Sequence, residues 1–171
     1  MRKIILVILA ILVGVCQAKG ALWYSSGYNT FTDGDPQGEE IFVENDAVLD
    51  FLSGTALGLR VIDTATANIY GGSITYDLYT SENSITNIYL IDLEILCSEH
   101  NCIVNLYAYD VDFYSTGGIS NDGYITGTFY QDDTSFLINF KNAGTVSHVN
   151  VVPEPATLIL FGLGGLLLRS S

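Results

Sequence analysis

Basic side chains are scarce in this sequence, whose 171 residues include six Lys and Arg but nineteen Asp and Glu. Between residues 19 and 152 only Lys19, Arg60 and Lys141 are basic, and eighteen acidic residues bring the net charge of this stretch to −15. Such a charge repels the phosphates of nucleic acids and of anionic lipids, and it keeps an exposed protein soluble. We therefore expect no nucleic-acid partner.

Residues that commonly carry out catalysis are also few. The sequence has two histidines, His100 and His148, but no Gly-x-Ser-x-Gly motif that would supply a nucleophilic serine for a catalytic triad. It also lacks phosphate-binding and cofactor motifs. We predict a protein that is not an enzyme and holds no cofactor. A polysaccharide hydrolase or lyase is the least favoured alternative, and it would use one of two acidic pairs. These pairs are Asp110 with Asp112 and Asp132 with Asp133.

Cysteine is limited to three residues, two of which enclose a four-residue loop. In an oxidising compartment Cys97 and Cys102 are predicted to form a short disulfide. A metal site made of Cys97, His100 and Cys102 would lack a fourth ligand, so it is disfavoured.

One acidic segment matches part of the EF-hand spacing. Asp33, Asp35, Gln37 and Glu44 stand at loop positions 1, 3, 5 and 12. Pro36 interrupts the loop, and the flanking residues have no helical pattern. These four residues are therefore a weak calcium candidate, a solvated turn is the better interpretation, and we predict no metal site.

What the sequence has in abundance is typical of β-structure. It contains eleven tyrosines and seventeen glycines, and no amphipathic helical stripe lies between its ends. An all-β domain is predicted. The expected strands are residues 41–43, 47–52, 59–62, 66–70, 74–80, 85–91, 103–109, 124–130 and 135–140.

An internal repeat indicates how the strands are arranged. Residues 59–70 recur nineteen positions later at 78–89, both copies end in Asn-Ile-Tyr, and a weaker copy lies at 45–54. A period of this length suits one coil of a β-solenoid and weakly resembles the coils of adhesins. We predict a short parallel β-solenoid of about three coils, with antiparallel strands from Cys97 onward capping it. A β-sandwich is the alternative.

The N-terminus has the pattern of a secretory signal. Arg2 and Lys3 precede an apolar run at residues 4–15, and small residues follow up to Ala18. We predict a signal helix at residues 1–18 that signal peptidase removes after Ala18. A retained membrane anchor is the alternative.

At the C-terminus, Pro153-Glu154-Pro155 opens an apolar run that Arg169 closes. This arrangement resembles the PEP-CTERM sorting signal, although that family usually ends in several arginines. The resemblance implies that Pro153, Glu154, Pro155 and Arg169 form the sorting motif within residues 153–171. It also implies a transmembrane helix that anchors the chain transiently until an exosortase processes it. A simple membrane anchor is the alternative.

Together these features predict three parts and one role. Residues 19–147 would form a β-rich extracellular domain, and residues 148–152 a linker to the sorting signal. The chain would be exported, held in the inner membrane during sorting, and released to the cell surface as a non-catalytic protein associated with exopolysaccharide or biofilm matrix. The alternative is a small polysaccharide-binding module that uses its tyrosines. Those tyrosines are Tyr70, Tyr76, Tyr79, Tyr89, Tyr107, Tyr109 and Tyr114.

Overall fold

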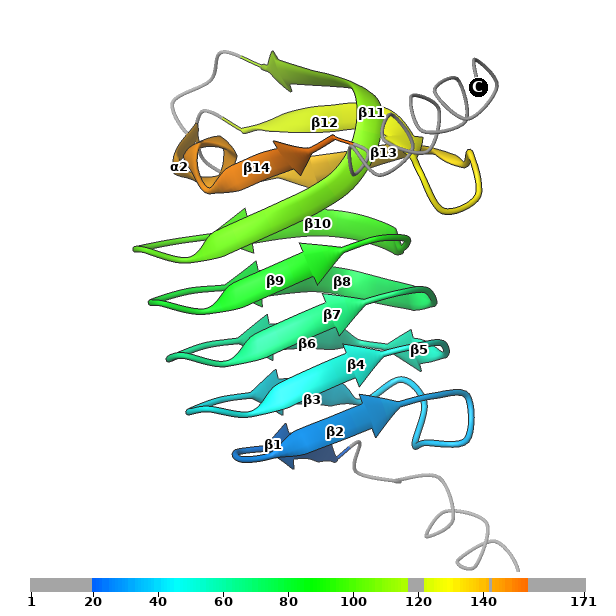
Figure 1. Cartoon of the computed structure of the whole chain (residues 1–171), viewed down its shortest axis with the longest axis vertical. Coiled ribbons are helices and arrows are strands. Elements are labelled where there is room, and N and C mark those ends of the chain that lie inside the picture. The colour runs from blue at the N-terminus through cyan, green and yellow to red at the C-terminus, as the bar shows by residue number, and fades with distance from the viewer. Residues whose placement is uncertain (1–19, 117–121, 142, 154–171) are drawn as a thin grey trace, which may run out of the picture.

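The chain winds into a stack of coils in the computed structural model, which describes residues 20–116, 122–141 and 143–153 (Figure 1). Each coil gives one strand to each of two parallel sheets. Sheet A holds β1 (Ala21–Tyr24), β3 (Glu40–Val43), β6 (Gly58–Val61), β8 (Ser73–Thr80) and β10 (Asp92–Ser98). Sheet B holds β2 (Tyr28–Phe31), β4 (Val48–Phe51), β7 (Thr66–Ile69), β9 (Ile85–Ile88) and the first part of β11 (Ile103–Ser115). The two-residue strand β5 (Thr55–Ala56) pairs with β8.

The all-β solenoid prediction is confirmed, but the predicted number of coils is too low. The solenoid has about five turns rather than three. The first turn and strand β10 were not recognised because their sequences do not repeat the pattern of the other coils. Stacking requires apolar inward positions and not a repeated sequence. Neighbouring strands within each stack are parallel, so the antiparallel β-sandwich alternative is wrong.

The core is a set of apolar columns between the two sheets. Ile41, Leu59, Leu78 and Leu96 occupy the same position in successive coils, and each is at most 1% exposed. On sheet B, the two copies of the repeat stack in register, because Asn68 pairs with Asn87 and the following isoleucines pair with each other. Alternation along each strand therefore sends one set of side chains into the core and the other to an outer face.

Each of four coils turns from sheet A to sheet B at a residue in the left-handed conformation. These residues are Asn45, Asp63, Glu82 and His100, with φ angles between 56° and 63°. Asn and Asp tolerate this conformation better than most residues because their short side chains bond locally. The Asp63 side chain also connects two corners, because its carboxylate accepts a hydrogen bond from the backbone N–H of Asn45 in the coil below at 2.9 Å.

The C-terminal end of the stack is capped by antiparallel strands. Strand β11 starts in sheet B beside β9 and then bends, with Asp110 at a φ of 51° and a bulge between Tyr109 and Asp112. Its second part pairs with β12 (Gly123–Phe129), which pairs with β13 (Ser135–Phe140). The predicted antiparallel cap is therefore present, but it begins at Ala108 rather than at Cys97.

The segment expected to be a linker is part of the fold. A short helix, α2 (Ala143–Ser147), leads into β14 (Val149–Val152), which runs parallel to β11. Its three valines are β-branched residues that favour a strand, and Val149 packs against the core. The ordered domain therefore extends to Val152 rather than ending at residue 147.

Both predicted terminal helices lie outside the described residues. The signal segment falls on residues 1–18, and the sorting signal beyond Pro153 falls on residues 154–171. Within the part of the chain that the structure describes, α2 is too short to cross a membrane, and no other helix there has the length and apolarity to do so.

Candidate ligand-binding face

Two columns of polar side chains run up the outer face of sheet B. We call this surface the ladder face, and it combines a column of carboxylate and amides with a column of tyrosines. Its residues are Asp50, Asn68, Asn87, Asn105 and Asn150, together with Tyr70, Tyr89 and Tyr107.

The amide column is a continuous hydrogen-bonded ladder. Asn68 Nδ2 donates to Asp50 Oδ1, Asn87 Nδ2 donates to Asn68 Oδ1, and Asn105 Nδ2 donates to Asn87 Oδ1, each at 2.8 Å. Asn150 Nδ2 completes the ladder by donating to Asn105 Oδ1 at 3.4 Å. Strands in a sheet are about 4.8 Å apart, which is close enough for each amide to reach the next.

Asp50 fixes the direction of this ladder. An ionised carboxylate can only accept hydrogen bonds, so every amide above it must point its nitrogen toward Asp50 and its oxygen away. The Tyr28 hydroxyl donates to the second carboxylate oxygen, Oδ2. Asp50 is only 9% exposed, and both of its oxygens have partners, which is how a buried charge is tolerated.

The tyrosine column lies beside the amides. The rings of Tyr70 and Tyr89 stack with centroids 4.8 Å apart, and those of Tyr89 and Tyr107 stack at 4.1 Å. Neighbouring rings cover each other's faces, so the column offers its ring edges and hydroxyl groups to a ligand. Burial, followed by the hydrogen bond and charge interaction with Tyr107, raises the pKa of Tyr89 to about 12. Its hydroxyl is therefore a neutral donor throughout the physiological pH range.

This pKa predicts a late tyrosine ionisation. Because the folded protein holds the Tyr89 proton up to about pH 12, the increase in tyrosinate absorbance should be incomplete at pH 11. A Tyr89→Phe variant should lose one late-ionising group, whereas the control Tyr76→Phe, which removes a 60% exposed tyrosine, should keep the late phase of the native protein. Between pH 10 and 12 only the unfolded chain would release this proton, so the stabilising contribution of Tyr89 should fall there. An absorbance titration of the three proteins measures this, and equal late phases in both variants would contradict it.

The outer face of sheet A has a different chemistry. Trp23 stacks on Phe42 with centroids 4.1 Å apart, and the Arg60 guanidinium lies 5.6 Å from the centre of the Tyr79 ring. Glu40 flanks Arg60 at 3.3 Å, and Asp77 lies at 3.7 Å from it. Two carboxylates therefore neutralise Arg60, so this cation is not free to bind an anionic ligand.

The weak calcium candidates do not converge. The Asp35 carboxylate accepts from the backbone N–H of Thr32 at 2.7 Å, which closes a local turn. Gln37 Oε1 accepts from the backbone N–H of Thr55, which ties this loop to a higher coil. Asp33 is exposed, and Glu44 lies at the opposite corner of the coil. Among the described residues, no group of three or more His, Cys, Asp or Glu side chains is placed to hold a metal ion.

The predicted disulfide is not formed, since Cys97 and Cys102 are both free thiols. Cys97 alternates with the buried residues Leu96 and Ser98 and so lies on the outer side of sheet A. Cys102 is buried at 3% exposure and precedes the inward Val104 by two positions. Opposite orientations therefore separate two residues that are close in sequence. Burial is also the main factor that raises the pKa of both thiols, which disfavours the reactive thiolate.

Each histidine contacts a serine hydroxyl, and the serine beside His148 is already engaged with a backbone carbonyl. His148 Nδ1 lies 3.3 Å from Ser98 Oγ, but this hydroxyl is buried and donates to the Thr145 carbonyl at 3.0 Å. His100 Nδ1 lies 3.1 Å from Ser81 Oγ at a solenoid corner. A serine already committed to a backbone carbonyl is a structural group rather than a nucleophile.

The acidic pairs serve local structure. The bulge at Asp110 breaks the alternation that would have placed it on one face with Asp112. Asp132 accepts hydrogen bonds from the N–H and hydroxyl of Thr134, and Asp133 accepts from the Tyr109 hydroxyl at 3.0 Å. This geometry favours turn formation over the paired acid and base of a glycosidase.

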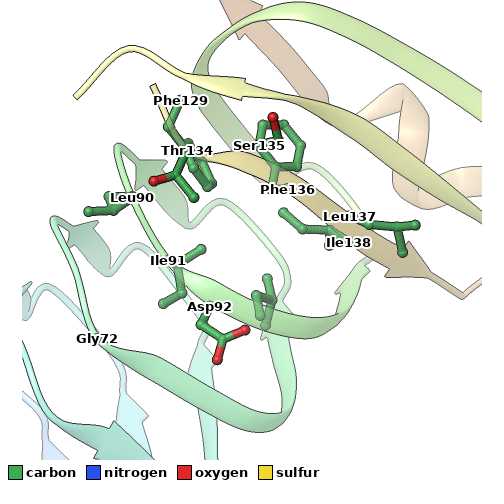
Figure 2. Close-up of a pocket in the computed structure, with 11 residues that line it drawn as sticks. Gly72, Leu90, Ile91, Asp92, Phe129, Thr134, Ser135, Phe136, Leu137 and Ile138 are labelled. Carbon is green, nitrogen blue, oxygen red and sulfur yellow. The ribbon is translucent and has the colours of Figure 1, made fainter. Parts of the chain in front are cut away.

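A pocket of about 390 Å³ opens between the last coil and β13 (Figure 2). Leu90, Ile91, Phe129 and Phe136 give it an apolar lining. Asp92 is the single ionisable side chain among its lining residues, so the pocket brings no acid and base together.

The fold and the ladder face define a short, capped parallel β-solenoid with a repetitive polar surface. Its last residues then identify the sorting route, because the PEP-CTERM protein-sorting motif matches residues 151–170. This motif indicates an exported protein that an exosortase processes at the membrane before it reaches the cell surface. No curated protein and no solved structure matches the chain.

Sequence reasoning found only part of the ladder face. It aligned Asn68 with Asn87, but it did not include Asp50 or Asn105 in the same column. A signal for Asn105 was present, because Asn-Leu-Tyr at 105–107 follows the second Asn-Ile-Tyr by eighteen positions. Asn150 had no such signal, since β14 returns to β11 from 45 residues away.

Proposed function

We propose that this chain is a non-catalytic protein of the extracellular matrix that binds exopolysaccharide through its ladder face. The observation that carries the proposal is the uninterrupted row of amide and hydroxyl groups, whose ladder side chains come from five neighbouring strands, β4, β7, β9, β11 and β14. Each ladder amide uses one N–H on its neighbour and keeps the other N–H and an oxygen lone pair for a ligand. Successive units of a hydroxyl-rich polymer can form hydrogen bonds with successive groups of the row. A compact ligand would contact only a few of these groups.

The charge of the surface selects among polysaccharides. Asp50 is the carboxylate of the ladder, and Tyr28 and Asn68 already use both of its oxygens. The rest of the ladder face is uncharged, while the whole chain carries a net charge of −13. A neutral polysaccharide is therefore favoured over a polyanion, which long-range repulsion would hold away.

The structure allows a test that leaves the ring stack in place. In the triple variant Tyr70→Phe, Tyr89→Phe and Tyr107→Phe, the three hydroxyls are removed and the rings stay. Hydrogen bonds contribute about 0.5–1.5 kcal/mol each, so binding should weaken by about tenfold or more. Cosedimentation of the secreted protein with exopolysaccharide from the producing cells measures this. Tyr76→Phe, a change on sheet A, is the matched control and should bind like the native protein.

Three results would contradict the proposal. The native protein could fail to sediment with the polysaccharide, or the triple variant could sediment as well as the native protein. Release of new reducing ends during prolonged incubation would show catalysis and would contradict the non-catalytic role. Binding of short soluble oligosaccharides with undiminished affinity would instead favour a small polysaccharide-binding module.

A further inference from the structure

The two ends of the solenoid are built differently. At the C-terminal end, β12, β13, α2 and β14 lie over the last coil (Figure 1). At the N-terminal end, the path of paired strands through both sheets begins at β1 and finishes at β2. Both strands belong to the first coil, so the two sheets end side by side on the same face. We call this surface, formed by β1 and β2, the end face.

The core is incompletely covered at the end face. Leu22 and Tyr24 are in register with Ile41 and Val43 of the next coil and point toward the same interior. The pair in the next coil is 0% exposed, whereas Leu22 and Tyr24 are only partly buried. Solenoids generally require a polar capping repeat at each end, and the first coil supplies an apolar one. Asn29, which is in register with the buried Leu49, is a polar residue at an inward position of this coil, and its amide donates to the Gly27 carbonyl at 3.2 Å.

The end face also lacks the usual protection against edge pairing. Exposed edge strands normally carry charged residues or proline, which discourage another chain from adding a strand. Residues 20–32 contain neither, in a chain with nineteen acidic residues. Trp23 and Tyr28 are 58% and 67% exposed on these two strands. The two edge strands carry no charge, which lowers the repulsion between two such acidic molecules along β1 and β2, while Asp33 and Asp35 lie in the loop that follows β2.

We propose that two copies of this chain associate head to head through their end faces. A twofold axis at the end face reverses the stacking direction, so β1 and β2 of one copy pair antiparallel with the edge strands of the other, and each Leu22 and Tyr24 becomes covered. The opposite end is capped, so the association closes at two copies and does not grow into a fibre. The predicted cleavage after Ala18 leaves only Lys19 ahead of Gly20, which is too short to form a covering strand.

The mass in solution of the secreted, processed protein tests this proposal by light scattering over a hundredfold concentration range. The native protein should have twice the mass of one chain. Trp23→Lys places like charges at the pairing edge while leaving the inward side chains unchanged, and it should raise the concentration for half-dissociation at least tenfold. Leu137→Lys is the matched control, since Leu137 is 56% exposed on β13 at the other end, and it should remain a dimer.

Hydrogen exchange gives a second readout that does not depend on a variant folding. Amides of residues 21–31 in the native protein should become more protected as the concentration rises, while those of β13 should not change. A native mass of one chain throughout the range would overturn the proposal, as would an assembly larger than two. Concentration-independent exchange in residues 21–31 would overturn it as well.

Discussion

A Gly72→Ala variant is expected to lose about 3 kcal/mol of its free energy of unfolding. Gly72 has a φ of 92°, which an L-residue rarely adopts, and its added Cβ would lie 2.6 Å from the carbonyl oxygen of Gly54. The same atom would lie 2.7 Å from the fully buried ring of Phe51. Neither neighbour can move freely, because one is backbone of the coil below and the other fills the core. Guanidinium unfolding of the secreted protein, followed by circular dichroism, measures the loss.

Gly27→Ala is the matched control for this experiment. Gly27 also has a positive φ, 71°, but no atom lies within 4 Å of its added Cβ. The control should therefore show only the conformational cost of about 1 kcal/mol. The difference between the variants isolates the contact between neighbouring coils at Gly72. Equal losses would contradict the idea that close stacking of the coils requires glycine there.

The coiled architecture could be predicted because it is encoded locally and repeatedly. The recurring Asn-Ile-Tyr segments specify a strand with an inward isoleucine and two outward side chains, and a single period relates them. Asn68 and Asn87 therefore fall in register once one copy is placed on the other. The first coil was missed because its inward residues, Leu22 and Tyr24, share only apolar character with their counterparts.

Contacts between segments that lie far apart in the sequence and share no repeat could not be predicted in this way. The bend of β11 at Asp110 and the pairing of β14 with β11 join segments that no repeat relates. The cysteine pair shows a related failure, because sequence separation placed Cys97 and Cys102 together while strand alternation turned them to opposite sides. In each case, three-dimensional context decided the outcome over local spacing.

Processing at the C-terminus should leave the folded domain intact and remove the residues beyond the sorting motif from every molecule, which lowers the mass of the chain. Strand β14 ends at Val152, and the exposed Pro153 follows it; proline has no N–H to extend the ladder to β11. A peptidase acting at or near Pro153-Glu154-Pro155 would therefore cut beyond the last paired residue. In the native host, the intact mass should correspond to a chain ending near this motif. In a strain without the exosortase, the chain should extend through Ser171.

Two variants separate recognition of the motif from folding. Replacing Pro153, Glu154 and Pro155 by alanines should leave the uncut chain in the membrane fraction even when the exosortase is present. Asn150→Ala removes the last amide of the ladder but keeps the motif, so this variant should be processed like the native protein. The processed domain should also unfold at the same guanidinium concentration as the unprocessed one, because every described strand lies before the cut. A C-terminus that remains at Ser171 in the native host would mean that the apolar run is a permanent anchor, and the chain would stay at the membrane instead of reaching the matrix.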